Sequence, residues 1–497
     1  MLFFTGYLLR LYISINNWPL TFVPYSFITI SYMNKNIIKK LQAIVGEKHL
    51  ATAKEDLMCY SYDGTGMEFM PAAVAFPGSA AEICSIMELA NQELFPVIPR
   101  GAGTGMTGGA LPIEGGLVLA TSRLNKILEI DTENQVAVVE PGVITGQFQA
   151  AVKREGLYYP PDPASRDFCT MGGNVAECSG GPSAVKYGVT RDYVLGLEVI
   201  LPDGRLMHTG VRTAKGVVGY DFTRLFIGSE GTLGVVSKII VRLLALPTHT
   251  RTFLVLTESL QQATLLVSDI LKSGILPNTL EYMDSTALSV VNDFLPLEVP
   301  QRTRALLLIE VDGAEKSTAE QGEKLLTLLA DRQRYPEILE VRQAGNDREV
   351  EDIWRARRSI SPATFKLRPH KISEDVVVPR SKIHQLVDFT EKLSQELGIV
   401  ILTFGHAGDG NIHVNIMVDK DNPVEDEKGQ EAKRRLFDHV ITLSGTLSGE
   451  HGIGITKAPF LSLELDGTSM EFMEKIKMLF DPNNILNPGK IFSTTRT

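Results

Sequence analysis

Two histidines flank a glycine-rich turn in the sequence GHAGDGNIH, at His406 and His413. The apolar segments on either side, 400–406 and 411–418, predict two strands joined by the pair Asp-Gly, which favours a two-residue type I′ turn. In that register His406 and His413 lie directly opposite each other, with Cβ atoms about 5 Å apart. This spacing suits two neighbouring ligands of one metal ion. The alternative is a pair of half-buried histidines that only pack on the hairpin.

The motif SGEHGIG at residues 448–454 adds a carboxylate and a further imidazole. In an extended chain, adjacent side chains face opposite directions, so Glu450 and His451 can serve different partners. We expect Glu450 to be the third metal ligand, which leaves open coordination positions for catalysis. His451 is then the general base, since an imidazole pKa near about 6.5 suits proton abstraction at neutral pH. A surface turn is the alternative. Two nitrogens and one carboxylate suit zinc, and also manganese or iron.

A glycine-rich loop, PRGAGTGMTGG, occupies residues 99–109. Its spacing formally matches the dinucleotide fingerprint, but that fingerprint requires a helix directly after the loop and an acidic residue about 20 positions later. Here ALPIEGGLVLAT predicts a turn and a strand, and position 123 is Arg123, so a Rossmann fold is excluded. The exposed backbone N–H groups still favour a pyrophosphate-binding loop over a mobile surface turn. Two more glycine clusters, at 171–181 and 228–236, suggest a long ligand such as a flavin dinucleotide.

Short strands and glycine-rich turns dominate the chain up to residue 246, and longer helix–strand units follow. Ile37, Leu41 and Val45 lie on one face of a predicted helix that ends at Gly46. Ser79 and Glu82 form a capping-box pattern for the next helix. We expect a boundary near 247, with repeated units over an antiparallel sheet after it. The predicted strands are 72–76, 95–99, 117–121, 135–141, 195–204, 233–243, 252–257 and 304–313. Helices are predicted to end at 272 and at 331, and a further helix is predicted at 467–480.

Composition narrows the class of protein. The 497 residues include 44% hydrophobic and 22% charged residues, which are ordinary globular values. A net charge of −10 without a basic block argues against nucleic-acid binding. The four cysteines form no CxxC pair, which argues against an iron–sulfur cluster or zinc ribbon in this chain and suggests a reducing, cytoplasmic location.

The first 32 residues do not fit the rest of the chain. They are apolar apart from Arg10, lack the basic start of a signal peptide, and are interrupted by Pro19 and Pro24, which argue against a transmembrane span. We interpret 1–32 as an extension outside the core, either an upstream translation artefact or a weak membrane-surface tail. The folded part is expected to begin near Met33.

Several motifs in a fixed order give the chain a family resemblance: PRGAGTGMTGGALP, PDPASRDFCTMGGNVAECSGG, GSEGTLGVV, GHAGDGNIHVN, SGEHGIG and NPGK. The chain resembles the FAD-linked oxidases of the vanillyl-alcohol oxidase and p-cresol methylhydroxylase superfamily. Within it, the glycolate oxidase FAD subunit, D-lactate dehydrogenase and D-2-hydroxyglutarate dehydrogenase are most similar. The resemblance implies an α+β fold, with a two-subdomain FAD-binding domain of p-cresol methylhydroxylase type and an α+β cap domain over the flavin ring. The implied division is FAD-binding domain 33–246, cap 247–455, and a C-terminal segment 456–497 that returns to the flavin.

The resemblance also implies roles for individual residues. It supports the metal set His406, His413 and Glu450 with His451 as base, and it adds a substrate carboxylate clamp and a substrate-binding amide. Residues 99–109 contain no histidine, so FAD is expected to be non-covalent. The expected substrate-binding residues are Arg357, Ser361, Lys371 and Asn415. The expected FAD contacts are Arg100, Gly101, Gly103, Thr104, Gly105, Gly108, Asp162, Gly172, Gly173, Asn174, Gly181, Val235 and Asn487.

These residues predict metal-assisted oxidation of a short 2-hydroxy acid, of the glycolate or D-lactate type, to the 2-oxo acid. Electrons pass from the flavin to a non-nicotinamide acceptor; the resemblance suggests an iron–sulfur partner, through which the protein could lie at a membrane surface. The alternatives are D-2-hydroxyglutarate oxidation, a same-fold oxidase of another alcohol, and a non-catalytic electron-transfer subunit. The substrate enantiomer, the metal and a homodimeric state stay open.

Overall fold

A computed structural model describes residues 33–295 and 298–492. The interpretation of residues 1–32 as a non-core extension lies outside this described part. The first described helix, Lys35–Val45, buries Ile37, Leu41 and Val45 and ends at Gly46, as predicted. In the described part of the chain, no helix is both long enough and apolar enough to span a bilayer.

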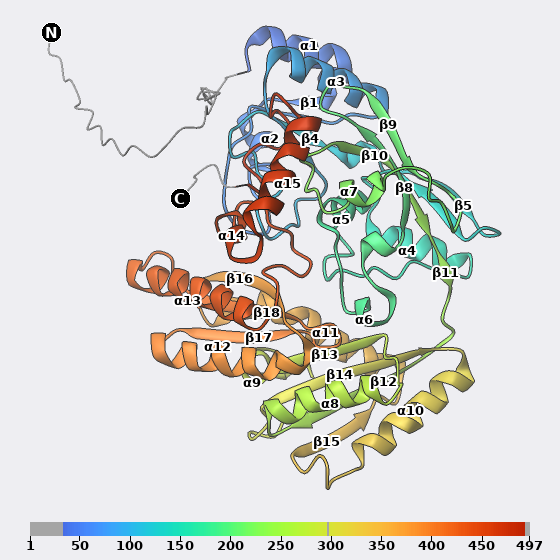
Figure 1. The fold of residues 1–497 in the computed structure, drawn as a ribbon, viewed down its shortest axis with the longest axis vertical. Helices are drawn as coiled ribbons and strands as arrows, with labels where there is room; N and C mark the ends of the chain where they lie inside the picture. Colours follow the sequence, from blue (N-terminus) through green and yellow to red (C-terminus); the bar gives the residue numbers. More distant parts are fainter. Residues whose placement is uncertain (1–32, 296–297, 493–497) are drawn as a thin grey trace, which may run out of the picture.

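Two small sheets and the short antiparallel pair β11-β7 form the upper half of the molecule (Figure 1). The first has the order β1-β2-β4-β3, with β4 parallel to both β2 and β3. The second is antiparallel, with the order β5-β6-β10-β8-β9. The elements of this half are α1 (Lys35–Val45), β1 (Leu50–Ala51), α2 (Lys54–Met58), β2 (Ala73–Ala75), α3 (Ala80–Glu93), β3 (Val97–Arg100), β4 (Leu117–Ala120), β5 (Ile127–Asp131), β6 (Val136–Val139), α4 (Thr145–Arg154), β7 (Leu157–Tyr158), α5 (Met171–Glu177), α6 (Ala184–Tyr187), β8 (Val194–Ile200), β9 (Leu206–Gly210), α7 (Phe222–Phe226), β10 (Val235–Arg242) and β11 (Leu244–Ala245).

One seven-stranded antiparallel sheet, which we call the cap sheet, forms the lower half. Its order is β15-β12-β14-β13-β17-β18-β16, and the predicted antiparallel pairing is confirmed. The predicted domain boundary at 246/247 stays a prediction; the first cap strand begins at His249. The elements are β12 (His249–Thr257), α8 (Leu260–Lys272), β13 (Thr279–Asp284), α9 (Ser285–Val291), β14 (Ala305–Gly313), α10 (Glu315–Leu329), β15 (Ile338–Gln343), α11 (Asp347–Ala363), β16 (His370–Val377), α12 (Ile383–Leu397), β17 (Val400–His406), β18 (Asn411–Val418) and α13 (Pro423–Thr442).

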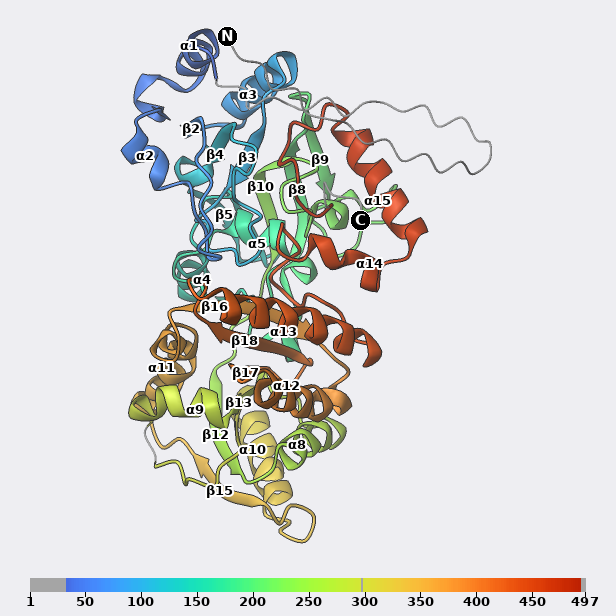
Figure 2. The same cartoon turned by 90° about the vertical axis from the view of Figure 1, so that its left-hand side faces the viewer.

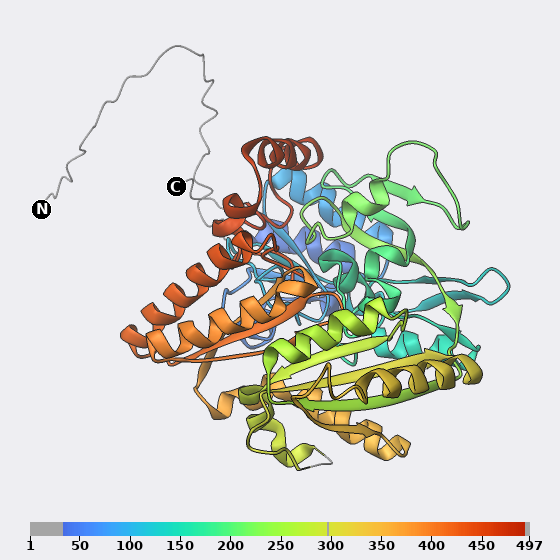
Figure 3. The same ribbon diagram turned by 60° about the horizontal axis from the view of Figure 1, so that its bottom comes forward.

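The two faces of the cap sheet differ in character because side chains alternate along each strand. One face packs its apolar side chains against α8, α10, α12 and α13, which cover it in Figure 3. The other face is covered only in part, by α9 and α11. The uncovered part of that second face carries polar side chains, and these belong to the site described below.

The C-terminal segment returns to the upper half, where α14 (Leu461–Glu464) and α15 (Gly467–Phe480) lie in Figures 1 and 2. Phe480 packs edge-on against Phe226 of α7, with ring centroids 5.5 Å apart. Further along, Asn487 donates from Nδ2 to the carbonyls of Gly109 and Glu230, at 2.9 and 2.7 Å. Residues far apart in sequence therefore hold the glycine loop in place.

Candidate active site

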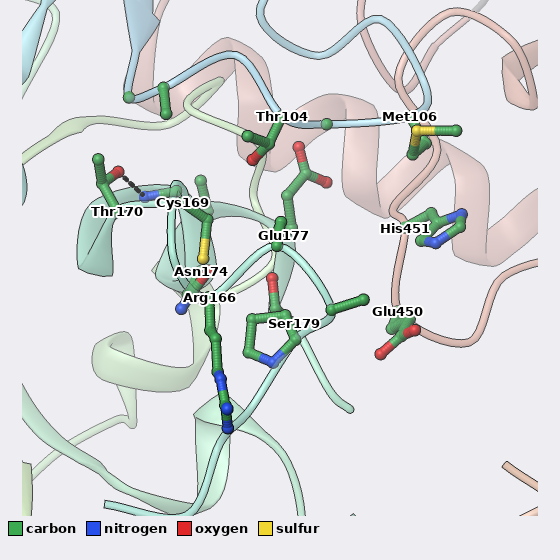
Figure 4. Close-up of a pocket in the computed structure, with 18 of the residues that line it drawn as sticks. Thr104, Met106, Arg166, Cys169, Thr170, Asn174, Glu177, Ser179, Glu450 and His451 are labelled. Carbon is green, nitrogen blue, oxygen red and sulfur yellow. Dashed lines mark hydrogen bonds between the residues drawn. The ribbon is translucent and has the colours of Figure 1, made fainter. Parts of the chain in front are cut away.

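A cavity of about 650 Å³ lies between the glycine-rich loops of the upper half and the polar face of the cap sheet. This volume is typical of a ligand pocket. Figure 4 shows Glu450 and His451 on one segment at its edge, with Asn174, Glu177 and Ser179 on another. The expected site residues that line it are Arg100, Gly101, Gly103, Thr104, Gly105, Asp162, Gly172, Gly173, Asn174, Val235, Arg357, Ser361, His406, His413, Glu450 and His451.

Five expected site residues do not line this cavity: Gly108, Gly181, Asn487, Lys371 and Asn415. Gly181 allows close packing on Asp162, whose carboxylate accepts hydrogen bonds from the N–H and hydroxyl of Ser183. Asn415 accepts a hydrogen bond from Ser373, at 2.8 Å, and it is Ser373 that lines the cavity. These residues support the walls from behind.

Close backbone approach explains two of the glycines in the 99–109 loop. Gly103 has a positive φ of 70°, and a Cβ there would lie 2.2 Å from the guanidinium of Arg100. A Cβ on Gly101 would lie 2.3 Å from the hydroxyl of Thr170, which caps α5. The loop runs directly into turn and then β4, which confirms that no Rossmann helix follows it. Backbone rather than side chains therefore forms this end of the cavity, which fits a pyrophosphate-containing cofactor.

The register of the histidine hairpin differs from the prediction. His406 pairs with Asn411, and His413 pairs with Phe404, so a four-residue loop replaces the predicted two-residue turn. The predicted and observed strand registers differ by two residues, and a register shift of two residues keeps each side chain on the same face of the sheet. His406 and His413 are therefore diagonal neighbours on one face, with ring centroids 5.2 Å apart. The prediction of directly opposite histidines is wrong, but their expected proximity is correct.

Glu450 completes a three-residue donor set with the two histidines. Its Oε1 lies 3.3 Å from Nε2 of His406 and 3.6 Å from Nε2 of His413. One ligand atom from each residue lies within 4.8 Å of the others. A zinc ion with bonds of about 2.0–2.2 Å to such donors needs them near these separations. The donor types and spacing therefore fit a divalent metal ion.

The charge states of the donors also fit a cation. Burial and the neighbouring His406 lower the pKa of His413 to about 3, so its ring carries a free lone pair at neutral pH. Burial alone would raise the pKa of Glu450, but the surrounding histidines outweigh it and lower that pKa to about 2. Burial alone would lower the pKa of His406, but Glu281 and Glu450 raise it well above its ordinary value. The cluster thus attracts a positive charge, whether a proton or a metal ion.

Asp375 on β16 fixes the loop that carries Glu450 and His451. Its Oδ2 accepts the backbone N–H groups of Gly449, Glu450 and His451, at 2.8, 2.7 and 3.2 Å. Lys457, which is 1% exposed, donates to the same carboxylate. Burial alone would raise the pKa of Asp375, but the charges of His451 and Lys457 hold it below its ordinary value. A buried, ionised carboxylate therefore organises the segment.

His451 lies between this carboxylate and the metal-ligand candidates. Its ring stacks on that of His413, with centroids 5.4 Å apart and planes at 18°. Its Nδ1 is 3.3 Å from Oδ1 of Asp375, although the alignment is not that of a hydrogen bond. Because Nδ1 faces the carboxylate, Nε2 is the atom left to exchange a proton with a ligand.

Some of the residues expected to bind the substrate carboxylate already contact other protein side chains. Arg357 and Ser361, four residues apart on α11, both line the cavity. Arg357 already pairs with Glu281, whereas Lys371 donates to the hydroxyl of Ser361 at 2.6 Å. In the described part of the chain Lys371 has no carboxylate partner, and burial lowers its pKa. From behind Ser361, the charge of Lys371 can balance that of an anion bound in the cavity.

Sequence reasoning missed Glu281, Asp375 and Ser373. Each lies in a strand, and only the strand order brings them beside residues from distant segments. The signal available was a single charged residue between apolar neighbours, as in TLEYM for Glu281. A buried charge of this kind needs a partner, but the sequence does not say which one.

Comparisons with known proteins agree with this arrangement. A family model described as FAD linked oxidases, C-terminal domain, matches residues 246–491, and another described as FAD binding domain matches residues 71–210. The protein named glycolate oxidase subunit GlcD from Bacillus subtilis (strain 168) is 42% identical over 93% of this chain and 97% of its own length. This chain belongs to the FAD-linked oxidases.

Other relatives narrow its place in that family. A protein named D-lactate dehydrogenase from Anaerostipes hadrus is 34% identical and covers 85% of this chain and 89% of its own. A solved structure of p-cresol methylhydroxylase matches with a TM-score of 0.74 and 17% identity, over 93% of this chain and 97% of that one. This likeness confirms the predicted fold class. The chain is an FAD-linked oxidoreductase of the glycolate oxidase and D-lactate dehydrogenase group.

Asp375→Asn is expected to lower the free energy of unfolding by about 3–5 kcal/mol, because Lys457 remains buried with only the more distant Glu374, at 3.9 Å, as counter-charge. Urea unfolding followed by circular dichroism measures this. Asp438→Asn, an exposed residue on α13, serves as control and should change stability by less than about 0.5 kcal/mol. A loss equal to that of the control would show that Asp375 does not hold the loop.

Proposed function

We propose that this protein oxidises a short 2-hydroxy acid, of the glycolate or D-lactate type, to the 2-oxo acid with the help of a divalent metal ion. One observation carries the proposal: His406, His413, Glu450, His451 and Arg357 share a single cavity with the glycine-rich loops. FAD, when bound along those loops without a covalent link, supplies the two-electron acceptor. Oxidases of phenols do not require a second, metal-binding group of this kind.

Different side chains of the site would bind the substrate carboxylate, hold the metal ion and accept the hydroxyl proton. Lys371, through its charge, and Ser361 and Arg357, through hydrogen bonds, would hold the carboxylate. His406, His413 and Glu450 would hold the metal ion, and a bound cation lowers the pKa of a hydroxyl group next to it. His451 would accept the hydroxyl proton at Nε2, while the charge of Asp375 beside Nδ1 stabilises the imidazolium. Zinc, manganese and iron all suit this donor set.

The electrons must then leave the flavin. One curated relative is named as a subunit of glycolate oxidase. By analogy, we propose that reduced flavin passes its electrons to a separate protein, such as an iron–sulfur partner. This chain carries no cysteine set for a cluster of its own.

Anaerobic mixing with D-lactate, L-lactate, glycolate and D-2-hydroxyglutarate tests the reaction directly. Bleaching of the flavin absorbance is expected with glycolate or one lactate enantiomer. After treatment with a chelator, bleaching should slow by at least about tenfold while the FAD content stays constant, and added Zn²⁺ or Mn²⁺ should restore it. No bleaching by any of the four acids, with FAD and metal present, would contradict the proposed reaction.

His451→Ala is expected to slow flavin reduction by about 10²–10⁴-fold, because the hydroxyl proton loses its acceptor. Stopped-flow absorbance measures the rate, and FAD and metal content are measured on the same sample. His208→Ala is the control, since that imidazole is 70% exposed on β9. Full turnover in His451→Ala would remove His451 from the mechanism.

Lys371→Met is expected to raise KM by about 10–100-fold with a smaller effect on kcat, because the substrate carboxylate loses the balancing positive charge behind Ser361, and the Ser361 hydroxyl loses its donor. Steady-state kinetics with an artificial electron acceptor separates the two constants. Lys366→Met replaces a nearby exposed lysine and should leave KM unchanged. An unchanged KM in Lys371→Met would place the substrate carboxylate elsewhere.

A further inference from the structure

Glu281 is a buried carboxylate to which neither the expected metal site nor the expected clamp gives a role. It lies on β13, in the centre of the cap sheet, and is 0% exposed. In the strand register it stands directly opposite His406 of β17. A charge at this depth is costly unless its oxygens are paired.

Each oxygen of Glu281 contacts a different functional group. Oε1 lies 2.5 Å from Nδ1 of His406. Oε2 accepts hydrogen bonds from Nε of Arg357, at 2.6 Å, and from the Nη2 atom of the same guanidinium. One carboxylate therefore bridges a metal-ligand candidate and an arginine of the carboxylate clamp.

The contact to His406 determines which nitrogen faces the metal site. When Nδ1 carries the proton shared with Glu281, Nε2 presents its lone pair toward Glu450 and His413. Carboxylates in this position commonly orient a ligating histidine and raise its basicity. The contact thus sets both the tautomer and the angle of the ring.

The contact to Arg357 limits what that guanidinium can do. Two of its nitrogens are directed at Glu281, and its planar group also lies over the ring of Phe404, 4.9 Å from the centroid. Arg357 lines the cavity, and its Nη1 atom takes no part in the contacts with Glu281. Since Glu281 neutralises it, Arg357 offers an anion a fixed hydrogen-bond donor rather than a net charge.

We infer that Glu281 is a positioning residue that aligns the metal site and the substrate-carboxylate site through one shared carboxylate. This inference rests on the proposed function and deepens it. Glutamine cannot replace Glu281, because its amide has one acceptor oxygen and presents an N–H₂ group to the second donor. Aspartate keeps the charge but is one methylene shorter, so it cannot hold both His406 and Arg357 in their present positions.

The test compares purified Glu281→Gln and Glu281→Asp with wild type. The Zn²⁺ dissociation constant, measured by competition with a colorimetric chelator, is expected to rise by about 10–100-fold in both variants. KM for the hydroxy acid is expected to rise as well, while FAD content stays at the wild-type level. Metal affinity is a readout that does not depend on turnover.

Asp269→Asn is the matched control. Asp269 also lies in the cap half, is 8% exposed, and pairs with Arg334 and Tyr335, but it does not line the cavity. It should lose stability without any change in metal affinity or KM. If both Glu281 variants fail to fold while Asp269→Asn folds, the role of Glu281 is structural and the inference is overturned.

The outcomes separate this inference from the proposed function. If wild type binds Zn²⁺ and is reduced by a hydroxy acid, but the folded Glu281 variants match it in affinity and KM, only the inference fails. If wild type binds neither Zn²⁺ nor Mn²⁺, the metal-assisted mechanism fails and the inference falls with it. A rise in both constants in both variants, with neither constant changed in Asp269→Asn, supports the inference.

Discussion

The site depends on the cost of burying negative charge. Glu281, Glu450 and Asp375 lie close together in a region shielded from water, and isolated carboxylates there would be strongly destabilising. Arg357 and Lys457 supply part of the compensating charge, and His406, whose pKa two of these carboxylates raise despite burial, supplies more. A divalent cation at His406, His413 and Glu450 would satisfy the same demand. The electrostatics that hold the fold together and those that would serve catalysis are thus the same.

The two halves of the molecule contribute different chemistry to one cavity. The upper half offers backbone from glycine-rich loops, which suits the phosphates of a dinucleotide, because phosphate oxygens accept from N–H groups. The cap sheet offers charged and imidazole side chains, which suit a small anion and a cation. Neither half alone surrounds a ligand. The segment at 448–454 is held by Asp375 of the cap sheet and by Glu230 of the upper half, so it ties the halves together and matters for function.

The cap sheet positions these side chains because a strand alternates its faces. Four polar side chains of the site come from four different strands: His406, His413, Glu281 and Asp375. They share one face of the cap sheet because each lies opposite another member of the set, or two residues from such a position, in the strand pairing. The opposite face of the same strands is apolar and covered by helices. The cap sheet, with one polar and one apolar face, is therefore a rigid support for the site. The outer wall of the site is the loop at 448–454, which is not a strand and depends on Asp375 for its geometry.

The sequence by itself determined the local elements and most of the expected residues that line the cavity. Strands β17 and β18, α8 and α15 end where their apolar patterns and turn residues end, and the glycine and histidine motifs belong to the cavity walls. Tertiary structure decided the register of the β17–β18 hairpin. The preference of Asp-Gly for a two-residue turn competes with the pairing of the two strands along their whole length, and the strand pairing determined the register. It also decided the partners of the buried charges. No local pattern links Glu281 to Arg357, 76 residues away, since only the packing of α11 on the cap sheet brings the two together.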